Sequence, residues 1–414
     1  MSRIIVLGSG AWGTALALSL HRRGGHQLSL WAHSPQFAQE IIDAGENKLF
    51  FPGFPLPPEI VITGDNAAVH DADIILSVVP SEFLRSTFAR LGPHLRPGQI
   101  IVSATKGVEN HSFLRMTQVI ASCLAESAEG DGGFESAEGD GGFNPRVSPI
   151  ASTRALAPEA LYQGTTSVVP QAHQNDSRAL APEGLKGHDF SRAANAAKPA
   201  WASAPEGFSL QIGALSGPSF ALEVAQGQPT ALTVAFDDPT IAARIQTEFS
   251  SETLRLYTST DVIGVELGGA LKNVIAIAAG VAAGVGLGYN SAAALMTRGI
   301  AEITRLAVAC GGRRETLAGL SGVGDLVLTC TGSLSRNRTV GQELGQGRKL
   351  PEILASLGGK VAEGVLTTRA ALGLARRHGI EMPIAEQMEQ ILNEGKDPRE
   401  AIKALMLRPA RDEH

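Results

Sequence analysis

Short apolar runs alternate with helical segments along the first part of the chain. These runs predict buried parallel strands at 4–7, 27–31, 74–81 and 99–107. Between the first two runs, small and apolar residues at 14–23 predict a helix that ends before Gly24 and Gly25. The alternation of strands and helices is typical of an α/β domain with a parallel sheet.

The apolar pattern changes near residue 260. Three further strands are predicted at 209–216, 230–235 and 254–258, and beyond Asp261 every periodic segment is helical. The longest apolar run, 274–287, is rich in Gly and Ala and falls short of the roughly 18 residues that suggest a membrane span. We therefore interpret it as a buried helix of an all-helical second domain.

Residues 126–206 differ in character from the rest of the chain. Residues 126–134 are repeated at 135–143, and 154–159 recur at 178–183. The stretch is rich in Ala, Gly, Pro, Ser and Glu and has no sustained periodicity, which predicts a low-complexity, disordered insertion. A partner-binding segment is the alternative. The predicted organisation is a first domain of residues 1–125 and 207–260, the insertion at 126–206, and a helical domain of residues 261–408.

Composition narrows the class of protein. The chain of 414 residues is 43% hydrophobic and 18% charged, and its net charge of -6 argues against a nucleic-acid or anionic-membrane partner. The three cysteines form no disulfide or metal-binding pattern, so we expect no metal and a reducing compartment. The apolar run 4–7 is too short for an export signal. We expect a cytoplasmic location.

The first strand leads into a glycine motif, Gly8-Ser9-Gly10-Ala11-Trp12-Gly13. In such a motif Gly8 permits the tight turn, Gly10 lets a pyrophosphate approach the backbone, and Gly13 lets the helix pack closely on the strand. The helix N-terminus then offers unpaired N–H groups to the phosphates. The motif predicts a dinucleotide site, although an ordinary glycine-rich turn has the same spacing.

The tip of the second strand bears on the choice of dinucleotide. An acidic residue there normally binds the ribose 2′-hydroxyl of NAD, but no Asp or Glu occurs from Gln27 to Gln39. The absence of a carboxylate permits a 2′-phosphate, to which His33 and Ser34 could donate hydrogen bonds. His33 could equally be a solvated loop residue. We expect NADP or NAD as the cofactor and favour NADPH.

Two strand ends place further polar residues at the edge of the sheet where ligands bind. Lys106 follows the strand at 99–107 and could hold a phosphate or a carbonyl, or could simply be solvated. Residues 217–221, Gly-Pro-Ser-Phe-Ala, follow the strand at 209–216 and turn directly into a helix. Backbone N–H groups at such a turn can meet an anion or the nicotinamide.

The helical half contains a lysine at an unusual position. Lys272 and Asn273 enter the long apolar helix, where burial would disfavour the charged ammonium. A lowered pKa would bring Lys272 towards the range in which it exchanges a proton near neutrality. Alternatively, its stem is buried while its charged end reaches water.

A second candidate cluster follows about fifty residues later. Asp325 lies beside glycines and could cap a helix or accept a hydrogen bond from a hydroxyl group of the substrate. Ser335-Arg336-Asn337-Arg338 assembles hydroxyl, guanidinium and amide donors at the start of a predicted helix, which suits a phosphate. A helix cap followed by solvated arginines is the alternative interpretation.

Taken together, these segments resemble the bacterial type of NAD(P)-dependent glycerol-3-phosphate dehydrogenase. The matching segments follow one another in the order of the family and cover nearly all the chain outside residues 126–206. They are residues 8–15, 104–109, 215–221, 264–277, 324–330, 335–338 and 361–364.

The resemblance implies reversible hydride transfer between a nicotinamide and C2 of sn-glycerol 3-phosphate, which gives dihydroxyacetone phosphate. It implies that Lys272 exchanges the proton of the C2 oxygen and that Lys106 contacts both cofactor and substrate. The other substrate positions would be Gly217, Ser219, Asp325, Ser335, Arg336 and Asn337. The NADPH positions would be Ala11, Trp12, His33, Ala221, Arg336, Val361 and Glu363, beside the glycine loop.

The same resemblance implies a homodimer, in which each chain has a Rossmann-type dinucleotide-binding domain and an all-helical C-terminal domain. It also implies that the enzyme supplies glycerol 3-phosphate for phospholipid synthesis. The insertion at 126–206 departs from the family, which has a short link there, and lies outside its motifs. We expect activity to survive its removal. The alternatives are another Rossmann-plus-helical dehydrogenase acting on a hydroxy acid or sugar acid, and a catalytically inactive dinucleotide-binding protein.

Overall fold

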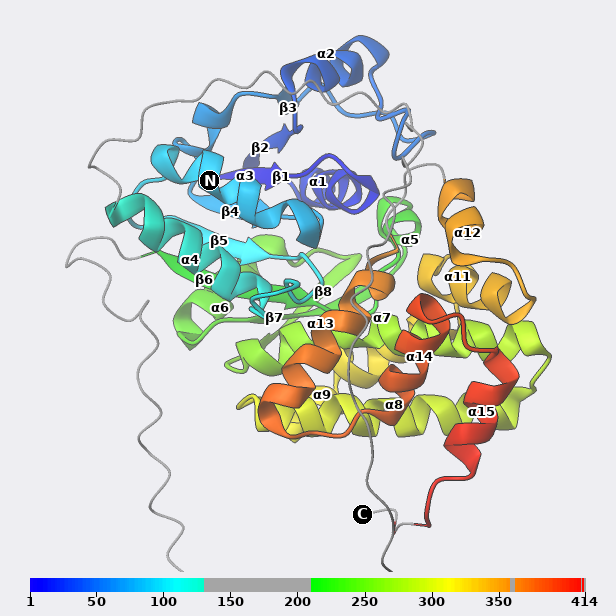
Figure 1. The fold of residues 1–414 in the computed structure, drawn as a ribbon. Helices are drawn as coiled ribbons and strands as arrows, with labels where there is room; N and C mark the ends of the chain where they lie inside the picture. Colours follow the sequence, from blue (N-terminus) through cyan, green and yellow to red (C-terminus); the bar gives the residue numbers. More distant parts are fainter. Residues whose placement is uncertain (130–209, 358–361, 411, 413–414) are drawn as a thin grey trace, which may run out of the picture. The chain divides into compact units, whose positions relative to one another are not determined.

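The computed structural model describes residues 1–129, 210–357, 362–410 and 412. The expectation that the insertion is disordered concerns residues 130–206, which lie outside the described residues. Eight strands form one sheet in the order β3-β2-β1-β4-β5-β6-β7-β8 (Figure 1). Every neighbouring pair is parallel except β6 and β7, which are antiparallel. The strands are β1 (Ser2–Leu7), β2 (His26–Trp31), β3 (Ile60–Thr63), β4 (Ile74–Ser77), β5 (Ile100–Ser103), β6 (Gln211–Ser216), β7 (Thr230–Ala235) and β8 (Leu254–Ser259).

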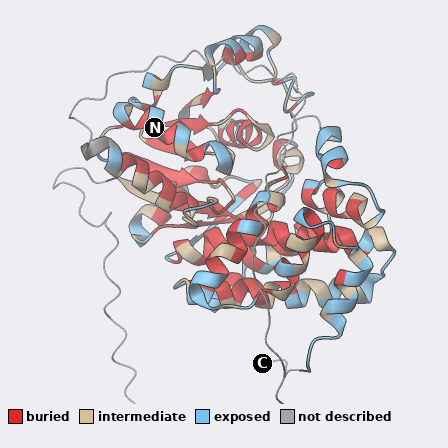
Figure 2. Cartoon of the chain, in the orientation of Figure 1, coloured by how far each residue is buried: buried red, intermediate tan, exposed pale blue. Residues whose placement is uncertain are grey.

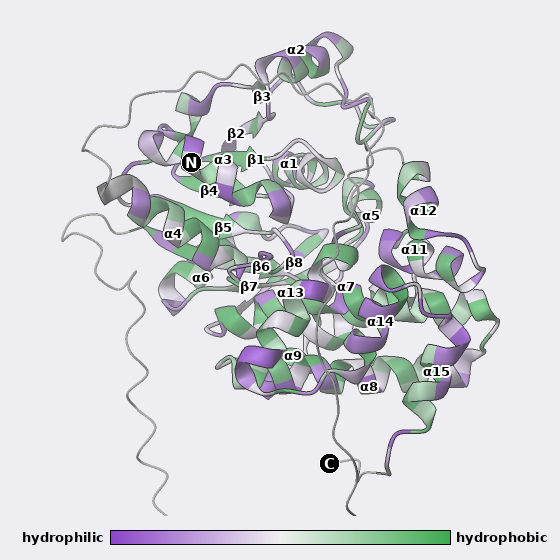
Figure 3. Ribbon diagram, viewed as in Figure 1, coloured by the Kyte–Doolittle hydropathy of each residue, from purple (hydrophilic) through white to green (hydrophobic). Residues whose placement is uncertain are grey.

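Helices cover both faces of this sheet because alternate strand residues point to opposite sides. Val6 packs in a cluster with residues of α1, α5 and α6, whereas Ile5 packs with residues of α3 and α4. Figures 2 and 3 show the strands as buried and largely hydrophobic. These helices are α1 (Ala11–Arg23), α3 (Leu84–Leu91), α4 (Met116–Glu129), α5 (Ala221–Ala225) and α6 (Pro239–Phe249), and α2 (Pro35–Ala44) packs beside β3.

Most predicted strands are confirmed, including one with the same bounds, Thr230–Ala235. The strands predicted at 74–81 and 99–107 are shorter, because β4 ends at Ser77 and β5 at Ser103. The residues that follow form the loops at the carboxyl edge of the sheet. The strand at 60–63 was missed, since it is only four residues long.

The end of α4 differs from the boundary expected at residue 125. The helix continues to Glu129, so the first four residues of the expected insertion are helical. Ala and Glu are good helix formers, and a helix already begun at Met116 extends through them at little cost.

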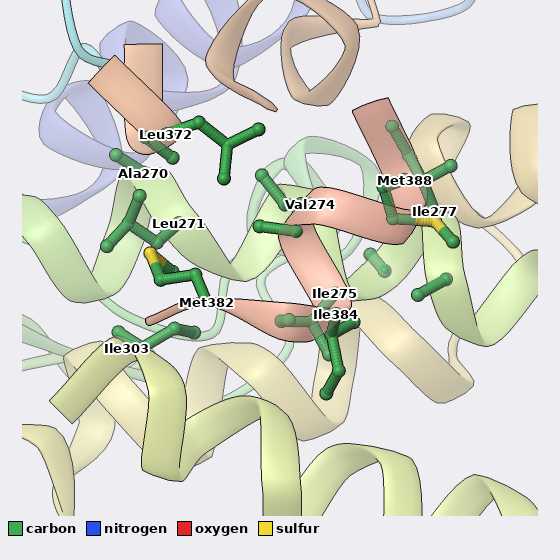
Figure 4. Close-up of a cluster of buried hydrophobic side chains, with 14 of the residues drawn as sticks. Ala270, Leu271, Val274, Ile275, Ile277, Ile303, Leu372, Met382, Ile384 and Met388 are labelled. Atoms are coloured by element: carbon green, nitrogen blue, oxygen red, sulfur yellow. The ribbon is translucent and has the colours of Figure 1, made fainter. Parts of the chain in front are cut away.

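The second half of the described chain is helical, and α7 (Val262–Val285) lies in its core. Figure 4 shows side chains of α7, including Val274 and Ile277, packed among residues of its neighbours. The other helices are α8 (Tyr289–Ala309), α9 (Arg314–Leu317), α10 (Asp325–Thr331), α11 (Arg336–Gly345), α12 (Leu350–Ser356), α13 (Glu363–His378), α14 (Pro383–Asn393) and α15 (Pro398–Met406). The predicted fold class, an α/β domain followed by helices, is confirmed.

Helix α7 is longer than the apolar run 274–287 suggested. Residues 262–273 continue it, and by length and composition alone it meets the criteria for a membrane span. However, 94% of its most hydrophobic window is buried inside the protein, so its apolar character serves packing. The interpretation of a buried helix is confirmed.

Glycines bring α11 unusually close to α7. A Cβ atom at Gly280 would lie 2.0 Å from the carbonyl oxygen of Arg338, and one at Gly341 would lie 1.9 Å from that of Ile277. Only glycine at these positions allows the two backbones to approach this far. The close packing sets the first turn of α11 beside the C-terminal half of α7.

Candidate active site

The glycine loop between β1 and α1 has the shape of a phosphate-binding turn. Gly8 has φ +107°, a conformation that favours glycine, and its N–H donates to the carbonyl of Trp31 over 3.1 Å. A Cβ at Gly13 would lie 1.8 Å from the Gly8 carbonyl oxygen, so Gly13 permits the tight loop as well as the close approach of the helix. A Cβ at Gly10 would meet nothing within 4 Å, which leaves space above the backbone.

Beyond this loop, β2 ends at Trp31 and His33 lies exposed two residues later. The ring of His33 lies against that of Phe37, with 5.4 Å between centroids. Ser34 is the N-cap of α2, and its hydroxyl oxygen accepts a hydrogen bond from the N–H of Phe37 over 3.2 Å. Ser34 therefore has a structural role at the tip in addition to the one expected.

Lys106 lies in the loop after β5 and reaches towards the helical half. Thr105 holds this loop, because its hydroxyl donates to the carbonyl of Val79 over 2.7 Å. The Lys106 Nζ donates to the Gly217 carbonyl over 3.2 Å and to Asp325 Oδ2 over 2.6 Å. Lys106 thus connects the turn after β6 with α10, and the alternative of a solvated loop lysine is wrong.

Lys272 lies inside the protein, with 7% of its surface exposed. Its Nζ donates to Asp325 Oδ1 over 2.5 Å and to the Thr329 hydroxyl oxygen over 2.7 Å. Asp325 is itself 1% exposed, and its two oxygens accept from Lys272 and Lys106 separately. The structure therefore excludes the alternative of a Lys272 whose charged end reaches water.

Burial lowers the pKa of Lys272 to about 8. The Asp325 carboxylate opposes this effect by favouring the charged ammonium, while the positive charge of Lys106 adds to it. A lysine with this pKa exchanges a proton readily near neutral pH. The cluster of Lys106, Asp325 and Lys272 thus provides a proton donor and acceptor at a fixed position.

The position of Asp325 follows from the chain around it. Residues 320–324 form a π-helical turn, after which Asp325 begins α10 without capping it. Thr329 lies four residues later on the same helix face, and its hydroxyl donates to the Asp325 carbonyl over 2.6 Å. Thr329 is not among the site residues predicted from the sequence, although this spacing from Asp325 could have indicated it.

Glu266 holds α7 against the start of α4. Its Oε1 accepts from the N–H of Thr117 over 2.8 Å, its Oε2 accepts from the Thr117 hydroxyl over 2.7 Å, and it forms an ion pair with Arg115. Glu266 lies on the helix that bears Lys272, so these bonds help to position Lys272 beneath the sheet edge. This buried link could not be predicted from the sequence, because Arg115 and Glu266 are far apart along the chain.

The first turn of α11 contains Ser335, Arg336 and Asn337, which the sequence suggested as donors to a phosphate. The Ser335 hydroxyl oxygen is the N-cap and accepts from the N–H of Arg338 over 3.3 Å. Arg336 is exposed, whereas Asn337 is buried and its Oδ1 accepts from the N–H of Gly364 over 3.0 Å. The cap predicted for Ser335 therefore exists, and Arg336 is exposed to solvent while Arg338 is half-buried.

Glu363 begins α13 near the same cluster, and its Oε2 accepts from Asn273 Nδ2 over 3.3 Å. Burial raises the pKa of Glu363, while the charges of Arg336, Lys106 and Lys272 oppose the rise. The hydrogen bond from Asn273 places Glu363 next to the helix that bears Lys272. Asn273 adjoins Lys272 on α7, so it is a further site residue that the expected set lacked.

The remaining expected residues lie around the sheet edge. Ala11 and Trp12 begin α1 and are half-buried, as are Ser219 and Ala221 at the start of α5. Ser219 donates from its hydroxyl to the Gly217 carbonyl over 3.1 Å, the same oxygen that accepts from Lys106. Val361 lies outside the described residues.

Comparison with known proteins decides the family. A sequence model described as the C-terminus of NAD-dependent glycerol-3-phosphate dehydrogenase matches residues 261–403. The corresponding N-terminal model matches residues 3–130 and 159–242. The chain belongs to the NAD-dependent glycerol-3-phosphate dehydrogenase family.

Individual members of the dehydrogenase family align with nearly the full length of this chain. A protein from Acidobacterium capsulatum named glycerol-3-phosphate dehydrogenase (NAD(P)+) is 48% identical over 417 residues, covering 100% of both chains. One of the same name from Geobacter sulfurreducens is 40% identical, covering 99% of this chain and 98% of its own. The crystal structure of glycerol-3-phosphate dehydrogenase from Coxiella burnetii is 31% identical, with a TM-score of 0.75, and covers 98% of this chain and 99% of its own.

The family matches bear on the expected insertion as well. The N-terminal dehydrogenase model does not match residues 131–158 and resumes at residue 159. It thus resumes inside the stretch expected to be an insertion. The resemblance stated from the sequence motifs is confirmed by these matches.

Proposed function

We propose that the protein transfers a hydride between a nicotinamide dinucleotide, NAD or NADP, and C2 of glycerol 3-phosphate, with dihydroxyacetone phosphate as the oxidised form. The observation that supports this most directly is the buried Lys272, held between Asp325 Oδ1 and Thr329. Its pKa of about 8 suits proton exchange with an alcohol or ketone oxygen. The names of the full-length relatives supply the substrate class.

The glycine loop fits a dinucleotide. The positive φ of Gly8 and the space beside Gly10 allow a pyrophosphate to approach the backbone at the N-terminus of α1. When bound, the nicotinamide supplies or accepts the hydride at C2. Around it, Ala11, Trp12, Ala221, Lys106 and Glu363 would line the cofactor site.

Lys272 acts as the acid in ketone reduction and as the base in alcohol oxidation. During reduction its ammonium donates a proton to the C2 oxygen as C2 gains the hydride. During oxidation the neutral amine removes the proton of the C2 hydroxyl as C2 loses the hydride. Asp325 orients Lys272 through its Oδ1. Lys106, which is held by the other carboxylate oxygen, can donate a hydrogen bond to the substrate oxygen.

The substrate phosphate would lie at the first turn of α11. Arg336 is exposed there and provides a charge-assisted donor, while Ser335 and Asn337 shape the turn. Gly217 and Ser219 would line the opposite side, next to Lys106. The phosphate and the reacting carbon would then contact two separate groups of residues.

The finer properties follow from the same proposal. The segment from Gln27 to Gln39 has no Asp or Glu to repel a 2′-phosphate, which supports a preference for NADPH. We infer a homodimer in the cytoplasm that supplies glycerol 3-phosphate for phospholipid synthesis, with neither nucleic acid nor membrane as partner. The names of the relatives reported above support this function and not the alternatives, a hydroxy-acid dehydrogenase or an inactive dinucleotide-binding protein.

The test is turnover by the purified full chain with NADPH and dihydroxyacetone phosphate. Replacing Lys272 by Ala should lower kcat by about 10²- to 10⁴-fold, the usual contribution of a positioned acid or base. Lys403→Ala is the matched control, since Lys403 is exposed on α15. Wild-type protein without NADPH oxidation, or a Lys272→Ala variant as active as wild type, would overturn the assignment.

A further inference from the structure

An arginine from α3 lies beside the tip of β2, although the two segments are far apart in sequence. The guanidinium carbon of Arg90 lies 5.6 Å from the centroid of the Trp31 ring. Trp31 is the last residue of β2 and is 1% exposed, so its indole provides a fixed surface under the cation. This places a positive charge where the dinucleotide-binding strand ends.

The charge of Arg90 also acts on His33, two residues beyond Trp31. The pKa of His33 is lowered, first by partial burial and then by the Arg90 charge, while Glu40 opposes the shift. Through this effect the charge of Arg90, which lies over Trp31, reaches the tip that bears His33. An anion between them would be attracted by Arg90 and would favour protonation of His33.

Arg90 differs from the other arginine of its helix. Arg85 donates from Nε and Nη2 to the two oxygens of Glu109, each over 2.9 Å. Arg90 is exposed, and no carboxylate of the described residues forms an ion pair with it. The absence of acidic residues between Gln27 and Gln39 leaves the tip without a carboxylate of its own.

We propose that Arg90 and His33 bind the 2′-phosphate of NADP(H), and that Arg90 is a residue that determines dinucleotide specificity. This inference rests on the proposed function and adds a residue to it from outside the loop after β2. A guanidinium matches a phosphate in charge and in hydrogen-bond geometry, and a histidine N–H supplies a second donor. The strand tip would supply His33, and the neighbouring helix would supply the permanent charge.

A binding measurement separates the phosphate from the rest of the cofactor. Titration calorimetry with adenosine 2′,5′-bisphosphate and with adenosine 5′-monophosphate compares two ligands that differ at the 2′ position. Arg90→Gln should weaken the bisphosphate by about tenfold or more, as expected for the loss of a charge-assisted bond, and should leave the monophosphate unchanged. Arg244→Gln, which removes an exposed arginine of α6, is the control for the change in net charge.

Turnover provides the second readout. Arg90→Gln should raise the KM for NADPH with little change in kcat, and leave kcat/KM for NADH as in wild type. Equal weakening of both nucleotides, an effect matched by Arg244→Gln, or wild-type protein that does not prefer the bisphosphate would each overturn the inference. Absence of turnover with either dinucleotide would instead contradict the proposed function, while the calorimetry would still decide the role of Arg90.

Discussion

The ammonium of Lys272 lies 2.5 Å from Oδ1 of Asp325, and both residues are buried. The other oxygen of the carboxylate accepts from Lys106, so two lysines share a single negative charge. The shared carboxylate cannot fully compensate both ammonium groups, and burial lowers the pKa of Lys272 to about 8. The arrangement keeps Lys272 in place while leaving it able to lose its proton.

The pKa of Lys272 predicts opposite pH profiles for the two directions of the reaction. Ketone reduction needs the protonated amine, so its rate should fall as pH rises through about 8. Alcohol oxidation needs the neutral amine, so its rate should rise through the same value. Steady-state rates in both directions, over a pH range that spans this pKa, provide the measurement.

Asp325→Asn serves as the control for this profile. It removes the negative charge that favours the ammonium, so the fall in ketone reduction should move to lower pH. Profiles that bend in the same sense in both directions would contradict the role of Lys272 as acid and base.

Arg336 is predicted to act on the substrate phosphate. Arg336→Ala should raise the KM for dihydroxyacetone phosphate by about 10- to 100-fold, the loss expected for a charge-assisted bond of about 1.5–3 kcal/mol. Arg338→Ala, two residues along α11, should have a much smaller effect. A comparison of KM values for the ketone and for its analogue without phosphate measures the contribution, and equal effects of the two substitutions would refute it.

Glu302 is predicted to make stability depend on pH. It is 3% exposed, its Oε1 accepts from the N–H of Ile384 over 2.9 Å, and Oε2 has no hydrogen-bond partner among the described residues. Burial raises its pKa to about 7. The pKa of Glu302 is higher in the folded protein than in the unfolded chain. The contribution of Glu302 to the free energy of unfolding is therefore fully present below the unfolded pKa, and it is lost as pH rises to about 7.

Glu302→Gln retains an acceptor for Ile384 and removes the buried charge. Above pH 7 it should raise the free energy of unfolding by about 1–2 kcal/mol, and in acid it should give no gain. Urea unfolding at several pH values measures this difference. Glu352→Gln, at an exposed position of α12, is the matched control, and an identical pH dependence in wild type and Glu302→Gln would disprove the prediction.

Residues 131–158 are predicted to be dispensable for catalysis. They lie outside the matches to the family, and every residue of the described site comes from other segments. A chain without them keeps α4 through Glu129 and should retain kcat/KM within about twofold, because the deletion removes no residue of the described site. Loss of turnover in a deletion variant with wild-type circular dichroism would show that the segment is required.

Local patterns predicted most elements of the fold. The alternation of apolar runs and helices indicated the sheet, and Thr230–Ala235 was predicted with its bounds. The four-residue strand Ile60–Thr63 was missed, because so short a segment gives too little periodicity to recognise. The antiparallel pairing of β6 and β7 was equally hidden, because pairing direction depends on the path of the chain between strands.

The sequence by itself determined the glycine loop, the acid-free tip and a lysine entering an apolar helix, because each is a pattern among near neighbours in the chain. Only the tertiary structure decided that Lys106 and Lys272 meet on Asp325, and that Arg90 lies over Trp31. These contacts join residues of different elements, and they arise when the sheet edge packs on α7 and α10 and when α3 packs beside β2. The protonation of Lys272 depends on that packing, because burial and the neighbouring charges together set its pKa.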